Sequence, residues 1–258
     1  YDVHGPLDAP AVVLGGSLGT TRAMWDEQLP ALAGEFRVIR YDHRGHGESH
    51  VPPGPYTMAE LAGDLLAVLD ELRIARAHLV GLSLGGMVAM QVAATYPERV
   101  GRLALICTAA RLGPARSWLE RATTARARGA AAIADAVTQR WFTPAFASSE
   151  RAAELRASLR TTPPEGYAGC CEAIATMDLR PLLGAIRAPT LVVAGADDPA
   201  TPPRLGQDIV DGVVRGGGSA HLQVVAGMAH LGSVERAGPV SELLLRHLEP
   251  TTEGAARG

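Results

Sequence analysis

The sequence predicts an α/β fold with a mostly parallel β-sheet flanked by helices. Short β-branched or apolar runs alternate with longer segments of helical periodicity, and this alternation is typical of parallel sheets. A chain of 258 residues is also long enough to bury a sizeable core. The runs expected to form strands are Ala11–Leu14, Phe36–Tyr41, Ala77–Leu82, Arg102–Cys107, Thr190–Ala194 and His221–Val225.

Met58–Leu72 has the apolar spacing of a helix, and we also expect helices over Gly85–Ala94 and Ser233–Leu248. Residues 114–181 contain no convincing strand, only a helical pattern rich in Ala, Arg and Glu. We therefore predict a core made of residues 1–113 and 182–248, with residues 114–181 inserted as a helical cap. Residues 249–258 have little to bury, and we expect a disordered tail or a linker there.

Composition excludes several classes of protein. The 24 basic residues against 27 acidic ones give no reason to expect a nucleic-acid partner or an anionic membrane surface. No unbroken apolar run is longer than that of Leu103–Cys107, which is far too short to cross a membrane. Every basic residue is arginine and asparagine is absent, which excludes a Schiff-base lysine, a P-loop lysine and a Cys-His-Asn triad.

The cysteines give no sign of a disulfide scaffold or a metal site. The three are Cys107, Cys170 and Cys171, two of them adjacent in sequence, so at most one disulfide can form. We expect buried thiols that act as small hydrophobic groups, and hence a cytoplasmic protein.

A candidate nucleophile lies between a predicted strand and a predicted helix. Gly81-Leu82-Ser83-Leu84-Gly85 matches G-x-S-x-G, in which small residues let the backbone turn sharply and expose the serine. The helix that follows directs unpaired N–H groups and a partial positive charge at the reacting centre. The sequence thus favours Ser83 as a nucleophile over an ordinary serine at the start of a helix.

A serine needs a base, and His230 alone of the eight histidines lies between the last predicted strand and the last helix. His43 and His46 flank an early turn and His221 lies on a strand, so we expect structural or exposed roles for them. The loop after the penultimate strand offers two acids, Asp197 and Asp198, to orient the imidazole.

Two backbone N–H groups should stabilise an oxyanion formed at Ser83. One belongs to Leu84, the residue after the nucleophile. The other is expected from the glycine-rich loop after the first predicted strand, where we choose Ser17 and keep its neighbour Leu18 as the alternative.

The chain resembles the α/β-hydrolase superfamily in three segments: Gly16–Thr20, Met24–Asp26 and Tyr41–Ser49. More narrowly, the chain is similar to 3-oxoadipate enol-lactonases of aromatic-acid catabolism. The cap carries this narrower resemblance, in Trp118–Arg121, Arg140–Pro144 and Gly166-Tyr167 with Cys170-Cys171. The resemblance implies the α/β-hydrolase fold and the chain order serine, acid, histidine, and it favours Asp198 over Asp197 as the acid.

The resemblance also implies a substrate and a reaction. The enzyme would hydrolyse 3-oxoadipate enol-lactone to 3-oxoadipate in the β-ketoadipate pathway, through an acyl-enzyme on Ser83 and without a metal or organic cofactor. The lactone bears a carboxylate, for which Arg121 is our first choice as partner, since it lies three residues after Trp118 on one helical face. Arg140 beside Trp141 is the second choice, and the alternative is that these arginines are solvated and the aromatic residues only pack.

The chain departs from the superfamily pattern in two places, because Gly15-Gly16 replaces a common His-Gly and a usual first strand would lie upstream of Tyr1. In some bacteria this lactonase is fused to a carboxymuconolactone decarboxylase, so residues 249–258 are a candidate linker. Other serine hydrolases of this fold remain as alternatives: a carboxylesterase, a carbon–carbon bond hydrolase or a cofactor-free perhydrolase. The alternative from another class is a non-catalytic ligand-binding module.

Overall fold

A seven-stranded β-sheet organises the computed structural model, which describes residues 1–249. The strand order is β1-β3-β2-β4-β5-β6-β7, and all neighbouring strands run parallel except β1, which pairs antiparallel with β3. The strands are β1 (Asp2–His4), β2 (Ala11–Gly15), β3 (Arg37–Tyr41), β4 (Ala77–Leu82), β5 (Val100–Ile106), β6 (Thr190–Gly195) and β7 (Ala220–Val225). The predicted α/β class is confirmed, and each run expected to be a strand forms one.

The sequence prediction missed β1 and expected a first strand only upstream of Tyr1. Asp2, Val3 and His4 are all half-buried and include only one apolar residue, so no strand pattern was visible. The segment is extended because its backbone pairs with Ile39 and its neighbours in β3 at the edge of the sheet. Its position is therefore fixed by strand pairing, not by an apolar run.

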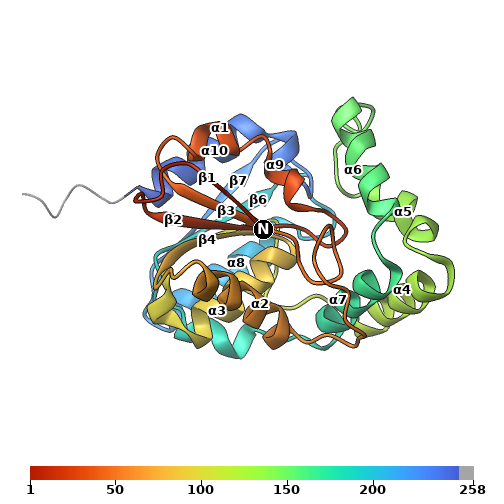
Figure 1. Cartoon of the computed structure of the whole chain (residues 1–258), viewed down its shortest axis with the longest axis horizontal. Coiled ribbons are helices and arrows are strands. Elements are labelled where there is room, and N and C mark those ends of the chain that lie inside the picture. The colour runs from red at the N-terminus through yellow and green to blue at the C-terminus, as the bar shows by residue number, and fades with distance from the viewer. Residues whose placement is uncertain (250–258) are drawn as a thin grey trace, which may run out of the picture.

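Helices cover both faces of the sheet (Figure 1). On one face lie α2 (Met58–Glu71) and α3 (Leu84–Thr95), and on the other lie α1 (Leu29–Leu32) and α10 (Ala237–Leu248). The remaining α-helices are α4 (Ala115–Arg128), α5 (Ala131–Thr138), α6 (Glu150–Arg160), α7 (Pro164–Thr176), α8 (Pro203–Arg215) and α9 (Gly232–Glu235). Short 3₁₀ helices occupy Arg22–Trp25, Pro97–Arg99 and Arg180–Ala185.

Local sequence explains where some helices begin and end. Thr57 and Glu60 form a reciprocal capping box that satisfies two free N–H groups at the start of α2. The segment expected to be one helix over Ser233–Leu248 is instead two, because the chain leaves helical geometry at Arg236, where φ is −123° and ψ is 48°. Helix α8 was not predicted.

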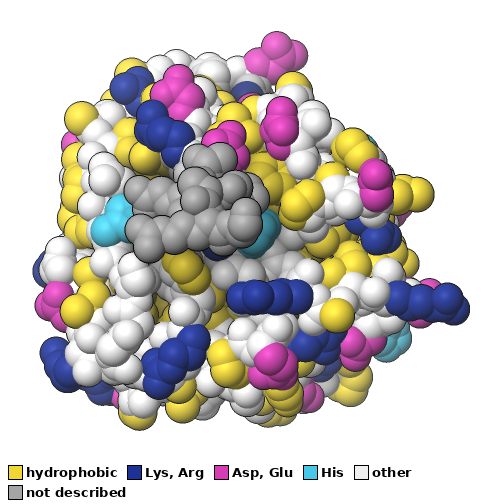
Figure 2. Space-filling model, turned by 90° about the vertical axis from the view of Figure 1, so that its left-hand side faces the viewer, with side chains coloured by type: hydrophobic (Ala, Val, Ile, Leu, Met, Phe, Trp, Pro, Cys, Tyr) yellow, Lys and Arg dark blue, Asp and Glu magenta, His cyan; other side chains and the backbone are white. Residues whose placement is uncertain are grey.

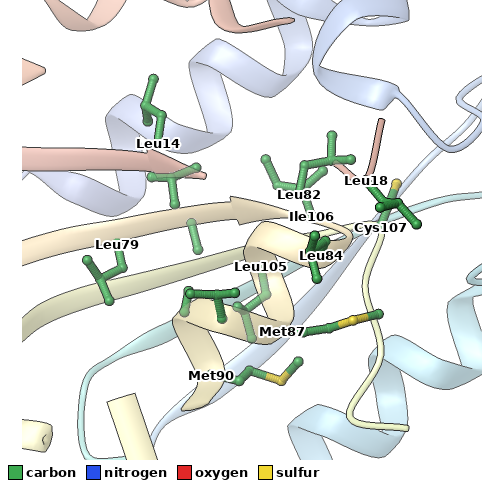
Figure 3. Packing of buried hydrophobic residues seen from close by; sticks show 14 of the residues in the cluster. Leu14, Leu18, Leu79, Leu82, Leu84, Met87, Met90, Leu105, Ile106 and Cys107 are labelled. Carbon is green, nitrogen blue, oxygen red and sulfur yellow. The ribbon is translucent and has the colours of Figure 1, made fainter. Parts of the chain in front are cut away.

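Helix α3 packs against β4 and β5 in the hydrophobic core (Figure 3). Leu84 and Met87 of α3 are fully buried, as are Leu79 of β4 and Leu105 of β5. This packing anchors both elements that flank Ser83, so the hydrophobic effect holds the G-x-S-x-G turn in place.

The predicted cap, residues 114–181, contains α4, α5, α6 and α7 and, over this fully described range, no strand. Figure 1 shows these helices grouped beside the sheet, with α7 packed against α4. Cys170 and Cys171 are buried in α7 and Cys107 follows β5; all three thiols are free, as expected.

Other features concern the outer surface and the chain end. None of the helices in residues 1–249 is both long and apolar enough to cross a membrane. On the side of the molecule seen in Figure 2, basic and acidic side chains are interspersed. The expected tail or linker at 249–258 lies, apart from Glu249, outside the described residues.

Glycines allow β2 and the start of α3 to touch. A Cβ atom on Gly85 would lie 2.2 Å from the backbone oxygen of Gly15, and a Cβ atom on Gly81 would lie 2.2 Å from the backbone oxygen of Gly85. Neither oxygen can move away without breaking the sheet or the helix, so only glycine fits at these positions.

We predict that Gly85→Ala lowers the free energy of unfolding by about 1–3 kcal/mol or more, since the added methyl group overpacks backbone against backbone. The matched control is Gly63→Ala in α2, where an added Cβ meets nothing within 4 Å. This control should raise stability by about 0.5–1 kcal/mol through helix propensity. Urea denaturation of both variants measures the difference, and equal midpoints would contradict the prediction.

Candidate active site

Ser83 lies on a strained turn between β4 and α3. Its φ of +55° and ψ of −113° are rare for a residue with a side chain and cost about 1–3 kcal/mol. The surrounding structure holds this conformation: the Ser83 N–H donates to the Ile106 carbonyl at 3.0 Å, and the Thr108 hydroxyl donates to the Ser83 carbonyl at 2.7 Å. Because its backbone is fixed on both sides, the Ser83 hydroxyl has a defined position at the end of the sheet.

The structure brings Ser83, His230 and Asp198 into one hydrogen-bonded chain. Ser83 Oγ is 2.9 Å from His230 Nε2, and His230 Nδ1 is 2.8 Å from Asp198 Oδ2. All three residues are buried, although they come from three separate loops at the end of the sheet. This is the arrangement in which an imidazole can take a proton from a serine while a carboxylate stabilises the resulting charge.

Asp198 is the acid that contacts the imidazole, whereas Asp197 beside it is exposed. The Asp198 carboxylate also accepts the Ala200 N–H at 2.8 Å and the Thr201 hydroxyl at 2.5 Å. Burial raises the pKa of Asp198, but the attraction of His230 and the hydrogen bonds from His230 and Thr201 outweigh burial and lower it to about 2. The group is therefore a carboxylate at neutral pH.

The backbone N–H groups of Leu84, Ser17 and Leu18, the candidates for the oxyanion hole, differ in their hydrogen bonds. The Leu84 N–H is in the first turn of α3, where the helix has no acceptor for it. The Ser17 N–H donates to Met24 Sδ at 3.2 Å, and the Leu18 N–H has no hydrogen-bond partner among residues 1–249. Ser17 and Leu18 line the same cavity as Ser83.

That cavity lies between the cap and the core and has a volume of about 320 Å³. Ser83 and His230 line it, together with the cap residues identified in the sequence. Those residues are Trp118, Arg121, Arg140 and Trp141, joined by Tyr167. A volume of this size suits a small organic molecule.

Arg121 and Arg140 are the cap arginines that line the cavity, and neither forms an ion pair with an acidic residue in the described chain. Arg121 stacks on Trp118, its guanidinium carbon 4.3 Å from the ring centre. Burial and the positive charge of Arg121 lower the pKa of Arg140, yet a guanidinium stays charged. By contrast, Arg126 binds Glu165 and Glu172. The cavity therefore contains two guanidinium groups that form no ion pair within the described chain.

Two further residues support the site and were missed in the sequence. Thr201 donates hydrogen bonds to Asp198 through its N–H and its hydroxyl. The spacing Asp-x-x-Thr is typical of such local hydrogen bonds and could have indicated this contact. Glu235 accepts the Ala229 N–H at 2.9 Å and the Thr143 N–H at 3.0 Å, so it ties the His230 loop to the cap. No local pattern indicates Glu235, because its cap partner Thr143 is distant in sequence.

The profile of the alpha/beta hydrolase fold family matches residues 10–236. The chain belongs to the α/β hydrolase fold family. This α/β hydrolase is 40% identical over 238 residues to 3-oxoadipate enol-lactonase 2 of Acinetobacter baylyi, which covers 92% of the chain and 87% of that protein.

Solved structures of other family members are also similar to this α/β hydrolase. The enol-lactonase from Burkholderia xenovorans has a TM-score of 0.91 and 41% identity, over 96% of this chain and 95% of that one. A thermophilic esterase from Thermogutta terrifontis has a TM-score of 0.88 and 30% identity, over 96% of this chain and 91% of that one. The predicted resemblance to enol-lactonases is confirmed.

We predict that Asp198 makes the stability of this α/β hydrolase depend on pH. The pKa of this carboxyl group is about 2 in the folded protein and 3.8 in the unfolded chain. Above pH 4 this difference adds about 2 kcal/mol to the free energy of unfolding, and the contribution is lost as the pH falls toward 2. An asparagine side chain cannot ionise, so Asp198→Asn should be less stable than the wild type at pH 6, and the gap should shrink between pH 4 and pH 2.5. Urea midpoints at these pH values test this, and a constant gap would contradict it.

Proposed function

We propose that this protein hydrolyses 3-oxoadipate enol-lactone to 3-oxoadipate by acyl transfer through Ser83. The observation that supports this most is that Ser83 and His230, hydrogen-bonded in a chain with Asp198, line a cavity together with two arginines that form no ion pair in the described chain. A small lactone with a carboxylate arm matches that combination of nucleophile and charge. The relatives named enol-lactonases, similar over nearly the whole chain, support the same substrate.

The first half-reaction opens the lactone ring. Ser83 Oγ attacks the lactone carbonyl carbon while His230 Nε2 takes the hydroxyl proton, and Asp198 stabilises the imidazolium that forms. The tetrahedral intermediate then breaks its bond to the ring oxygen. That oxygen leaves as an enolate, which His230 protonates, and the enol so produced tautomerises to the ketone of 3-oxoadipate.

The backbone N–H groups of Leu84 and Ser17 stabilise the negative charge on the tetrahedral oxygen by hydrogen bonds. Each such donor is worth about 3 kcal/mol in enzymes of this type. The Ser17 N–H donates to a thioether in the structure, which is a weak acceptor. An oxyanion is a much stronger acceptor, so it displaces the sulfur at little cost.

The second half-reaction releases the product. His230 removes a proton from water, which attacks the acyl-enzyme carbonyl, and the bond to Ser83 Oγ breaks as the proton returns to that oxygen. One water is consumed for each lactone, and the product is a dianion at neutral pH. Every proton transfer is carried by His230, so a metal ion has no step to perform in this sequence.

The carboxylate arm is recognised by the cap. Arg121 has a planar fork of donors suited to a carboxylate and is held in place by its stacking on Trp118. Arg140 adds a second charge from the segment that also carries Trp141. Repulsion between these two unneutralised arginines is relieved when an anion binds, which favours anionic substrates over neutral esters.

Removal of the nucleophile gives the most direct test. Ser83→Ala should reduce kcat for the enol-lactone at least about 10⁴-fold, since no other group can form the acyl-enzyme. Ser158→Ala on α6 is the matched control and should keep full activity. The fall in ultraviolet absorbance of the lactone measures turnover, and near-normal activity of Ser83→Ala would contradict the proposal.

Arg121→Leu should raise KM for the lactone about 10- to 100-fold with a smaller effect on kcat, because a charge-assisted hydrogen bond is lost. Turnover of a neutral p-nitrophenyl ester should be almost unchanged. Arg116→Leu is the control on the same helix, since the Arg116 side chain is 88% exposed and pairs only with Glu120. Equal losses on lactone and neutral ester would show that Arg121 does not bind the carboxylate, and faster turnover of neutral esters by the wild type would favour a carboxylesterase.

A further inference from the structure

His43 and His46 lie in the turn after β3 and contact the loop that carries Ser17 and Leu18. Both histidines are almost fully buried, which is unusual for residues in a connecting turn. Their rings pack edge to face, 6.4 Å between centres. The sequence suggested only a structural or exposed role, so the use of these two imidazoles requires explanation.

His43 holds the start of the loop. Its Nε2 is 3.0 Å from the Gly16 carbonyl oxygen, which also accepts the Gly85 N–H at 2.9 Å. A carbonyl oxygen can only accept, so the Nε2 atom of His43 must carry the proton. The Gly16 carbonyl is thereby fixed from two sides, by the histidine turn and by the first turn of α3.

His46 holds the other end of the loop with the opposite tautomer. Its Nδ1 is 3.2 Å from the Arg44 carbonyl and must carry the proton, which leaves Nε2 as an acceptor. The Gly19 N–H donates to that Nε2 atom at 3.0 Å. Burial keeps both rings neutral, lowering the pKa of His43 and of His46 to about 4, so these hydrogen bonds persist at neutral pH.

Side chains of the cap pack closely against the loop at Gly19. That residue has a φ of +81°, and a Cβ atom there would lie 2.4 Å from Leu159 of the cap and 3.1 Å from Tyr167. The histidine turn contacts the cap as closely, since a Cβ atom on Gly45 would lie 2.2 Å from Gly166. The cap thus encloses the loop on one side while the histidines bind it on the other.

We propose that His43 and His46 are positioning residues that fix residues 16–19, so that the loop's backbone N–H groups are ready to receive the oxyanion formed on Ser83. The inference rests on the proposed acyl transfer at Ser83. Hydrogen bonds at both ends leave Ser17 and Leu18, between them, with one N–H on a weak sulfur acceptor and one without a partner in the described chain. Donors fixed before the reaction need no reorganisation in the transition state, which is where their catalytic value arises.

The experiment compares a transition-state analogue with the product. The probe is a trifluoromethyl ketone bearing a carboxylate arm, which adds a serine hydroxyl to form a hemiketal whose oxyanion occupies the same site as the intermediate. In His46→Leu, we expect the Ki of the ketone to rise and kcat/KM to fall by the same factor, about 100-fold. The Kd of 3-oxoadipate should change less than about twofold, because the product has no tetrahedral oxyanion.

Two further variants separate positioning from folding. His46→Gln keeps an acceptor for the Gly19 N–H and should recover most of the lost ketone affinity. His43→Leu, at the other end of the loop, should give the same pattern as His46→Leu even if the latter folds poorly. Thermal melting and active-site titration normalise each value to folded enzyme.

The possible outcomes are distinct. If both leucine variants keep the wild-type Ki for the ketone, or lose ketone and product affinity equally, the positioning role is wrong. If the wild type itself forms no hemiketal, seen as an unchanged ¹⁹F resonance, acyl transfer through Ser83 is wrong and the inference fails with it.

Discussion

The site depends on a backbone conformation that Ser83 would not adopt by itself. A serine at positive φ is unfavourable by about 1–3 kcal/mol, and the surrounding contacts must hold it there. The close approach of Gly15 and Gly85, the hydrogen bond to Ile106 and the buried packing of α3 against the sheet provide those contacts. Because the core fixes the backbone of Ser83, replacing Gly15 or Gly85 would act directly on the position of the Ser83 hydroxyl, which is the proposed nucleophile.

Charge is distributed in the site with a clear division between core and cap. The core supplies the negative charge of Asp198, which three donors and the imidazole stabilise in a buried position. The cap supplies positive charge on Arg121 and Arg140, which have no acidic partner in the described chain. In the proposed reaction, the core therefore carries out the proton transfers, whereas the cap selects the charge of the substrate. Glu235 joins the two parts by holding the His230 loop to Thr143.

Most elements with a strong local signal were predicted correctly. The parallel strands have apolar runs because both faces of the sheet are covered, α2 has helical apolar spacing, and α3 is an apolar segment buried almost throughout. Two missed features lack such a signal: β1 is held by pairing at the sheet edge and by ion pairs of Asp2, and the break between α9 and α10 depends on the backbone at Arg236. Helix α8 was missed although its apolar residues recur at helical spacing. In the site, Ser83 and His230 could be found from motif and chain order, but Glu235 could not, since its partners lie in the cap and in the His230 loop.

The sequence by itself determined the fold class, the turn that carries Ser83 and the residue types available for chemistry, because these follow from periodicity, glycine spacing and composition. Only the tertiary structure decided which neighbouring acid reaches His230, which arginines lack an acidic partner in the described chain, and how His43 and His46 hold the loop around Ser17. The physical reason is that local conformation depends on adjacent residues, whereas charge neutralisation and hydrogen-bond partnership depend on groups that only the folded chain brings together.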